Sequence, residues 1–349
     1  MVPSNLKISI CIPQYNRINY LLRSLKIIEA QQYPDIEIVI SDDCSTDDTE
    51  VKIKELALGY RYPIIYDKNP VNFGYDRNYR KCIEMASGKY VIVIGNDDSL
   101  YGDDCIDLLV NFLKANQYPD IGFCNMIEER TGGTLIQRAQ STAILGNGAE
   151  VALHHYSCFS FVGGLIYKRE TFLKYNTAAY DGSIYAQMYM GVFMIAKGVT
   201  LFSINNPLVL KDLLMDGVFR NSYRDRIAKK WKEYKVVDGG LPSVINVLIS
   251  ALSDAGEATQ KRIKYIFRRI YSVTYPHWIL DYKENGALPE AFGLVAGMNP
   301  LRNINYKKLN LHNRILLYIL YISVSFFALI TPIFIFKKLK TRLYRYFKK

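Results

Sequence analysis

Residues 90–98 read Tyr-Val-Ile-Val-Ile-Gly-Asn-Asp-Asp, a short apolar run that leads directly into two adjacent carboxylates. Val91–Ile94 is β-branched throughout, which is typical of a strand buried on both faces of a parallel sheet. Ligands of open α/β sheets bind at the carboxyl ends of such strands. Carboxylates placed there must be hydrated, paired or bound to a cation, because burying them bare is costly. The stretch therefore predicts either a solvated turn or a cation site at Asp97 and Asp98.

An earlier segment, Lys7–Asn16, has the same organisation. It reads Lys-Ile-Ser-Ile-Cys-Ile-Pro-Gln-Tyr-Asn, which predicts a strand that ends at Pro13, because proline cannot donate to a β-ladder. Leu21–Ala30 follows with helical apolar spacing, and Asn19 is a plausible cap for that helix. Together they predict a strand–helix unit with a polar connection.

Two more segments place polar side chains at equivalent positions. In Glu37–Asp48 an apolar run ends in Asp42 and Asp43. In Asn69–Asn78, which reads Asn-Pro-Val-Asn-Phe-Gly-Tyr-Asp-Arg-Asn, a polar connection leads into a helix predicted over Tyr79–Ala86. The order of these segments predicts that the polar tips of three βα units meet at one edge of a sheet.

These motifs make the chain resemble glycosyltransferase family 2, whose members have the GT-A fold and use nucleotide-sugar donors. The resemblance is strong over about residues 5–125 and looser to about residue 215. The motifs over residues 72–78 and 95–98 are most similar to those of bacterial O-antigen transferases of the abequosyltransferase type. The motifs that carry the resemblance are Ile12-Pro13-Gln14-Tyr15-Asn16-Arg17, Ser41-Asp42-Asp43-Cys44-Ser45-Thr46-Asp47, Asn72-Phe73-Gly74-Tyr75-Asp76-Arg77-Asn78 and Gly95-Asn96-Asp97-Asp98.

The resemblance implies a role for each matching residue. Asp43 is implied to hydrogen-bond the nucleotide base. Asp97 and Asp98 match the metal motif of the family, which implies Mg²⁺ or Mn²⁺ as cofactor, with Asp98 as the direct ligand and a catalytic group. Asn96 stands at the first position of that motif, where a neutral amide attracts a cation less. The nucleotide-sugar site is implied to comprise Pro13, Tyr15, Asn16, Asp43, Asn72, Gly74, Arg77, Asn78, Asn96 and Asp97.

The resemblance also implies an inverting reaction, in which a positioned base takes the proton of the acceptor hydroxyl. The family supplies this base as an Asp from a later segment, often within a Glu-Asp pair. Residues 179–187 contain no such pair, and Asp181 is the only carboxylate among them. Asp181 is therefore the candidate base, with a loop carboxylate that caps the next helix as the alternative interpretation. His154 and His155 are the reserve candidates.

The net charge is unevenly distributed along the chain. The whole chain of 349 residues has a net charge of +11, but residues 1–222 carry −4 and residues 223–349 carry +15. The resemblance implies a mostly parallel, Rossmann-like GT-A domain, which we expect over 1–222, and the charge division predicts a basic helical region over 223–349. Helices are predicted at Tyr223–Lys235, Leu241–Leu252 and Arg262–Tyr275. The six cysteines form no Cys-x-x-Cys pair, which favours reduced thiols in a cytosolic setting.

The end of the chain predicts membrane association. Ile315–Phe336 holds 22 uncharged residues, which would extend about 33 Å as a helix, long enough to cross a bilayer. Pro332 follows Thr331 within it, and both flanks are basic, which does not orient a single span cleanly. A segment that lies in the interface would keep both flanks near anionic lipid. A true span and a buried helix of a soluble protein are the alternatives.

These observations predict a glycosyltransferase on the cytoplasmic face of a bacterial inner membrane. It would transfer a sugar from a nucleotide sugar to a polyprenyl-diphosphate-linked saccharide in surface polysaccharide or O-antigen synthesis. The main alternative is a non-catalytic membrane scaffold with a degenerate transferase domain. A nucleotidyltransferase would need a Gly-rich phosphate loop, and residues 11–20 contain no Gly. A nucleic-acid partner is not expected, because it would not explain the uncharged segment.

Overall fold

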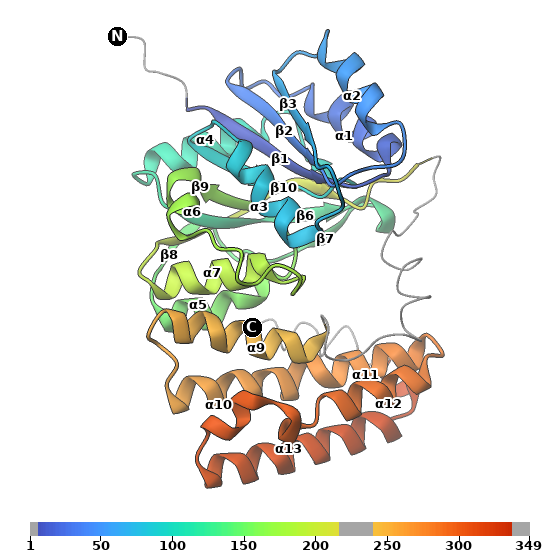
Figure 1. Ribbon diagram of the computed structural model, residues 1–349, viewed down its shortest axis with the longest axis vertical. Helices are drawn as coiled ribbons and strands as arrows, with labels where there is room; N and C mark the ends of the chain where they lie inside the picture. Colours follow the sequence, from blue (N-terminus) through green and yellow to red (C-terminus); the bar gives the residue numbers. More distant parts are fainter. Residues whose placement is uncertain (1–5, 216–239, 337–349) are drawn as a thin grey trace. The chain divides into compact units, whose positions relative to one another are not determined.

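The computed structural model describes residues 6–215 and 240–336 (Figure 1). The chain divides into two compact units, residues 1–220 and 221–349, and each is described by itself. The first unit is an α/β structure with one sheet and flanking helices, and the second is helical in its described part. The helix predicted at Tyr223–Lys235 lies outside the described residues.

The sheet of the first unit has the strand order β3-β2-β1-β4-β9-β6-β10-β5, and β7 and β8 pair with β6 and β10. The four strands at the β3 end run parallel, as the apolar runs predicted. Beyond β4 the sheet is mixed, because β9 runs antiparallel to both β4 and β6. The strands are β1 (Ile8–Gln14), β2 (Ile36–Asp42), β3 (Ile64–Lys68), β4 (Tyr90–Val93), β5 (Ser99–Leu100), β6 (Ile121–Glu128), β7 (Thr134–Ile136), β8 (Ala143–Gly146), β9 (Leu165–Lys168) and β10 (Leu201–Lys211).

The parallel strands form the core because they are apolar on both faces. Ile10 on β1, Ile38 on β2 and Ile92 on β4 are wholly buried and face one another in register. Burial of each such side chain contributes about 1.5–3 kcal/mol relative to exposure. Since β1 lies between β2 and β4 and runs parallel to both, the carboxyl ends of all three strands meet at one edge of the sheet.

The helix after β1 begins earlier than the sequence predicts. Helix α1 starts at Ile18, and its N-cap is Arg17, not Asn19. Both Asn16 and Arg17 adopt left-handed backbone conformations, with φ of 53° and 63°, so the chain turns sharply directly after β1. The helical segments of this unit are α1 (Ile18–Ile28), α2 (Thr49–Ala57), α3 (Tyr75–Met85), α4 (Cys105–Ala115), η1 (Glu129–Thr131), α5 (Ala149–His155), η2 (Tyr156–Phe159), α6 (Arg169–Tyr175) and α7 (Ala186–Ala196).

The second unit packs around a cluster of tyrosines. Tyr271, Tyr275 and Tyr321 are buried with their rings about 6 Å apart. The hydroxyl groups of Tyr275 and Ser325 share a hydrogen bond of 2.7 Å, so Ser325 joins the core and does not interrupt its helix. The segments of this unit are α9 (Leu241–Asp254), α10 (Gln260–Arg269), the π-helical turn η3 (Ile270–Thr274), α11 (Tyr275–Glu284), α12 (Leu288–Gly297), η4 (Pro300–Arg302), η5 (Ile304–Lys308) and α13 (Leu311–Ile330).

Candidate functional site

The structure brings the end of β2 and the connection after β3 together through Asp43. The buried Asp43 carboxylate accepts hydrogen bonds from the side chain of Asn69 at 2.9 Å and from the amides of Phe73 and Gly74 at 2.8 and 2.9 Å. The side chain of Asn72 donates to the Asp43 carbonyl at 3.2 Å. Asp43 therefore fixes the connection that leads into α3, a role that the sequence did not reveal.

Asn78, on the first turns of α3, ties the ends of β1 and β2 together. Its amide nitrogen donates to the carbonyl groups of Gln14 and Ser41, and its carbonyl oxygen accepts from the Ser41 hydroxyl at 2.7 Å. Arg77, one residue earlier, is exposed, and its guanidinium lies 3.4 Å from the ring centroid of Phe73. Asn78 thus shapes the sheet edge, while Arg77 presents a cation at the surface beside it.

Asp98 lies buried at the end of β4. Its Oδ1 accepts from the amide of Asp212 at 3.0 Å and its Oδ2 from the amide of Gly95 at 3.2 Å. Burial, together with the charge of Asp97, raises the pKa of the Asp98 carboxyl from 3.8 to about 7. A Cβ atom on Gly163 would lie 2.9 Å from Oδ2, so glycine at that position leaves space for the carboxylate.

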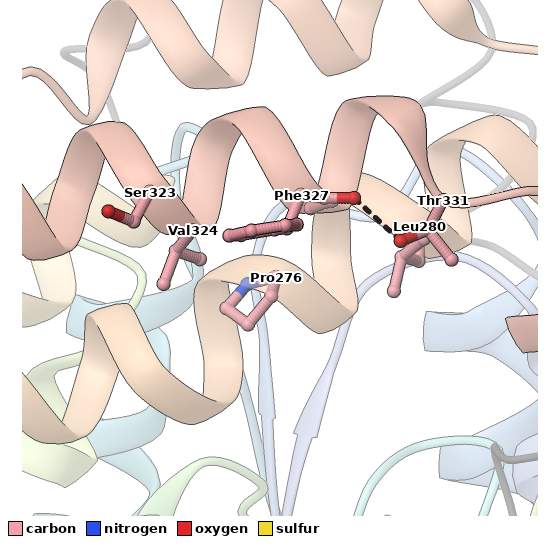
Figure 2. Close-up of a pocket in the computed structure, with 7 residues that line it drawn as sticks. Pro276, Leu280, Ser323, Val324, Phe327 and Thr331 are labelled. Atoms are coloured by element: carbon pink, nitrogen blue, oxygen red, sulfur yellow. Dashed lines mark hydrogen bonds between the residues drawn. The ribbon is translucent and has the colours of Figure 1, made fainter.

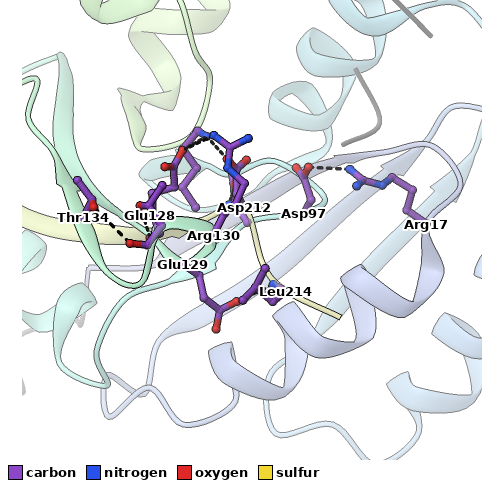
Figure 3. A network of polar contacts seen from close by, with 11 residues as sticks. Arg17, Asp97, Glu128, Glu129, Arg130, Thr134, Asp212 and Leu214 are labelled. Atoms are coloured by element: carbon purple, nitrogen blue, oxygen red, sulfur yellow. Dashed lines mark hydrogen bonds and ion pairs between the residues drawn. The ribbon is translucent and has the colours of Figure 1, made fainter. Parts of the chain in front are cut away.

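Asp97 faces the connection after β1 instead. Its carboxylate forms an ion pair with Arg17 at 2.6 Å (Figure 3). Asn96 donates to the Tyr15 carbonyl at 3.3 Å, which joins the same two strand ends. Arg17, in its left-handed conformation, thus reaches the acidic pair across the sheet edge, and no local pattern predicted this contact.

A third acidic element, at the end of β10, was missed by the sequence analysis. Asp212 has a left-handed φ of 56°, and besides the bond from its amide to Asp98, the Leu213 amide donates to the Asp97 carbonyl. The Asp212 carboxylate contacts Lys211 at 2.5 Å and Arg130 at 3.7 Å (Figure 3). Burial raises the pKa of the Asp212 carboxyl above its usual value. The only sequence signal is a Lys-Asp pair that follows a long apolar strand.

The candidate base Asp181 is held by a cation. Its carboxylate receives a bidentate pair from Arg80, with Nε to Oδ1 at 2.8 Å and Nη2 to Oδ2 at 2.5 Å. The loop that carries Asp181 is also fixed to α3, since Asp76 accepts from the amides of Ile184 and Ala186. Asp181 thus contacts α3 through Arg80, whereas Asp98 contacts Asp212 at the end of β10.

The reserve histidines lie on α5. The ring of His155 packs at 5.9 Å from that of the buried Phe123 and at 4.6 Å from that of His154. Burial, with His154 nearby, lowers the pKa of His155 to about 4, so its imidazole is neutral at pH 7. These contacts give His155 a packing role.

The acidic pair has the chemistry of a shared cation site. Within the described ranges no three His, Cys, Asp or Glu side chains come together to hold a metal ion by themselves. Mg²⁺ is usually bound through one or two carboxylates plus substrate phosphates. Asp97 and Asp98 supply two carboxylates, and burial together with the charge of Asp97 raises the pKa of Asp98, so its charged form is favoured by a cation partner. The donor set therefore fits a divalent cation that a diphosphate completes.

A family model, Glycosyl transferase family 2, matches residues 9–185, about half of the chain. The chain belongs to glycosyltransferase family 2. This match confirms the resemblance to the family and the class as a glycosyltransferase, and the solved structures described below confirm the α/β GT-A fold class.

Two bacterial glycosyltransferases are similar to this chain in sequence. The chain is 33% identical over 226 residues to "Abequosyltransferase RfbV" of Salmonella typhimurium, a match that covers 58% of this chain and 66% of that protein, just under two thirds. It is 24% identical over 233 residues to "GalNAc(5)-diNAcBac-PP-undecaprenol beta-1,3-glucosyltransferase" of Campylobacter jejuni, covering 62% and 70%.

Two solved structures share the fold. Staphylococcus aureus TarS 1-349 in complex with UDP has a TM-score of 0.57 at 14% identity, covering 93% of this chain and 89% of that one. The mannosyltransferase PcManGT of Pyrobaculum calidifontis, in complex with GDP-Man and Mn²⁺, has a TM-score of 0.53 at 15% identity, covering 93% and 87%. At these identities the likeness concerns the fold alone.

Proposed function

We propose that this transferase moves a sugar from a nucleotide-sugar donor to a lipid-linked saccharide acceptor in bacterial surface polysaccharide or O-antigen synthesis. The observation that carries the proposal is the convergence of three polar strand ends, those of β1, β2 and β4, on one edge of the sheet. The name of the Campylobacter relative, which includes PP-undecaprenol, supports a lipid-linked acceptor.

The nucleotide is proposed to lie over the ends of β1 and β2. Pro13, Tyr15 and Asn16 would line the pocket beside the base, and Asp43 would hydrogen-bond the base edge. Asp43 already accepts three hydrogen bonds, and a carboxylate has about four lone-pair sites. One acceptor site therefore remains, and the three donors hold the carboxylate in a fixed orientation for it. The remaining proposed contacts, around the connection before α3 and the end of β4, are Asn72, Gly74, Arg77, Asn78 and Asn96.

The diphosphate is proposed to lie at Asp97 and Asp98. Mg²⁺ or Mn²⁺ held by these carboxylates would stabilise the negative charge that grows on the leaving nucleoside diphosphate. Arg17 keeps the Asp97 carboxylate oriented through its ion pair. The amides of Gly95 and Asp212 do the same for Asp98, so the carboxylates need little rearrangement on binding.

Asp181 is proposed as the base that takes the acceptor proton in an inverting reaction. The bidentate contact from Arg80 fixes its plane and leaves a second lone pair on each oxygen. The proposed reaction takes place on the cytoplasmic face of the inner membrane, where a polyprenyl-linked acceptor would be held.

A thermal-shift screen of the full chain tests the donor site. A ligand that binds the native state raises the apparent stability by about 2.7 kcal/mol when present at 100 times its dissociation constant. We expect one nucleoside diphosphate among UDP, GDP, CDP and dTDP to raise the melting temperature, and more so with Mn²⁺. Incubation with the matching nucleotide sugars should then release nucleoside diphosphate. No shift with any of the four, and no donor turnover, would favour the non-catalytic scaffold.

A further inference from the structure

The outward face of α13 is mainly apolar, although His312 and Ser323 lie on the same side of the helix. Eight large apolar side chains of this helix are 43–65% exposed. Their spacing follows the helical period, so they share one side of the helix. Apolar patches of this extent on a protein surface mark an interaction site. The eight residues are Leu311, Ile315, Leu316, Ile319, Ile322, Phe326, Phe327 and Ile330.

The opposite face of α13 is packed within its own unit. Leu317, Tyr321 and Ala328 are buried, and the Tyr321 hydroxyl donates to the Val295 carbonyl of α12 at 2.8 Å. At the carboxyl end, the Lys283 ammonium of α11 donates to the carbonyl groups of residues 328, 329 and 331. The helix is therefore bound along its length, and its apolar outward face is separate from its packed face.

The helices beneath α13 are too polar to enter a bilayer. α10, which contacts α13, carries five basic residues among its ten, and α11 carries Asp281, Lys283 and Glu284. If α13 crossed the hydrocarbon core of about 30 Å, these charges would be drawn to membrane depth, where each costs several kcal/mol. A helix that lies in the interface instead places only its outward face in lipid.

We propose that α13 lies in the plane of a bilayer, with its outward face in the lipid and the rest of the helical unit above it. The occupant of this face is anionic lipid, because the sequence around the helix is basic. Lys307 and Lys308 are exposed just before α13, and residues 337–349 contain seven Lys and Arg and no acidic residue. Each basic residue near an anionic surface contributes about 1 kcal/mol of attraction.

A groove beside this face fits the same partner. It has a volume of about 250 Å³ and lies between α11 and α13, lined mainly by apolar atoms. Figure 2 shows Val324 and Phe327 of α13 facing Pro276 of α11 across it. Phe327 belongs to the outward face as well, so the groove opens where a hydrocarbon chain of a bilayer lipid would lie.

Vesicle flotation of the full chain tests the surface. The inference rests on the proposed function for the acceptor membrane, but flotation needs neither donor nor turnover, so the two can fail separately. The double variant Ile319→Glu/Phe326→Glu removes two apolar groups and adds two charges at exposed positions. We expect its partition into phosphatidylethanolamine–phosphatidylglycerol vesicles to fall by roughly a hundredfold or more, from a loss of about tenfold for each large apolar side chain. High salt should release the wild type only in part, because salt screens the charges and leaves the apolar contact.

Leu58→Glu is the matched control. Leu58 is 90% exposed on the first unit, so this variant replaces an exposed apolar side chain by a charge outside the helical unit and should float as the wild type does. Deletion of α13 is unsuitable, because its buried face belongs to the core of the helical unit. Unchanged melting temperature in the double variant shows that the fold is intact; if it drops, the milder pair Ile319→Ser/Phe326→Ser replaces it. Flotation of the folded variant equal to that of the wild type overturns the proposal.

A protease-protection experiment distinguishes an in-plane helix from a spanning one. An epitope placed after Lys349 should be protected in intact spheroplasts and digested in inverted inner-membrane vesicles. An epitope placed before Met1 should behave in the same way, because both lie on the cytoplasmic side. Digestion of the C-terminal epitope alone in intact spheroplasts would show that α13 crosses the membrane and would overturn the in-plane arrangement.

Discussion

Substitution of Asp98 by Asn should stabilise the metal-free protein while it abolishes transfer. The buried Asp98 carboxyl has a pKa of about 7 in the folded state, against 3.8 for an ordinary Asp. The folded state therefore binds its proton more tightly than the unfolded state does. Stability falls as the pH rises from about 4 to about 7, and the full penalty applies above that range. With 1.36 kcal/mol for each pKa unit, the penalty at pH 8 is about 4 kcal/mol.

An asparagine removes this charge but keeps only part of the hydrogen bonding. Its carbonyl oxygen can still accept from the Asp212 amide, whereas its amino group would face the Gly95 amide, another donor. That mismatch costs about 1–3 kcal/mol. The expected net gain is about 1–3 kcal/mol, or several degrees in melting temperature for a unit of this size.

Thermal unfolding at pH 5 and pH 8 in EDTA measures this effect. The wild type should lose stability between the two pH values, and Asp98→Asn should lose much less. Added Mn²⁺ with nucleoside diphosphate should stabilise the wild type only. Asp67→Asn serves as the control, because the Asp67 side chain is 57% exposed and pairs with Lys81, not with either residue of the acidic pair. A wild type that is equally stable at both pH values, or an Asp98→Asn protein that melts lower at pH 8, would refute the reasoning.

Three further predictions concern other carboxylates. Glu37 is buried, yet hydrogen bonds from Lys7 and two serines outweigh that burial and hold its pKa at about 2. The free energy of unfolding should therefore fall by about 3 kcal/mol as the pH drops from about 4.5 to about 2. Acid titration of Glu37→Gln should show a shallower fall. Asp43→Ala should weaken nucleoside diphosphate binding by about 1–3 kcal/mol in calorimetry; an unchanged dissociation constant would argue against its contact with the base. Asp181→Asn should lower kcat by about 10²–10⁴ with donor KM preserved, and unaffected turnover would place the base elsewhere.

The strands of the site could be predicted from the sequence because their signal is local. The apolar runs around Ile10, Ile38 and Ile92 identify buried parallel strands, and the polar residues after them have only one edge of the sheet to occupy. The apolar stretch at the end of the chain, Ile315–Phe336, was also identified from composition. Helix α13 (Leu311–Ile330) begins just before this stretch and covers its first part. Each of these inferences needs only the order of residues in a short window.

The contacts between distant segments could not be predicted in this way. Asp212 reaches Asp98 across 114 residues, and Arg80 reaches Asp181 across 101. Neither partner has a local pattern that distinguishes it from a surface charge. The start of α1 was missed for a different reason, since the left-handed conformations of Asn16 and Arg17 arise from their surroundings, and neither residue favours them strongly enough to be recognised.

Several unfavourable features of the first unit gather around Asp98, although Gln117, Tyr118 and Ile184 adopt left-handed conformations elsewhere in the unit. Asp98 is a buried carboxylate with a raised pKa, and the residues that approach it or its neighbour Asp97 include Arg17 and Asp212, both in left-handed conformations that ordinary side chains rarely adopt. Such conformations cost about 1–3 kcal/mol each. Costly features of this kind concentrate at functional sites, and a buried carboxylate at the end of β4 makes the expected ligand a cation.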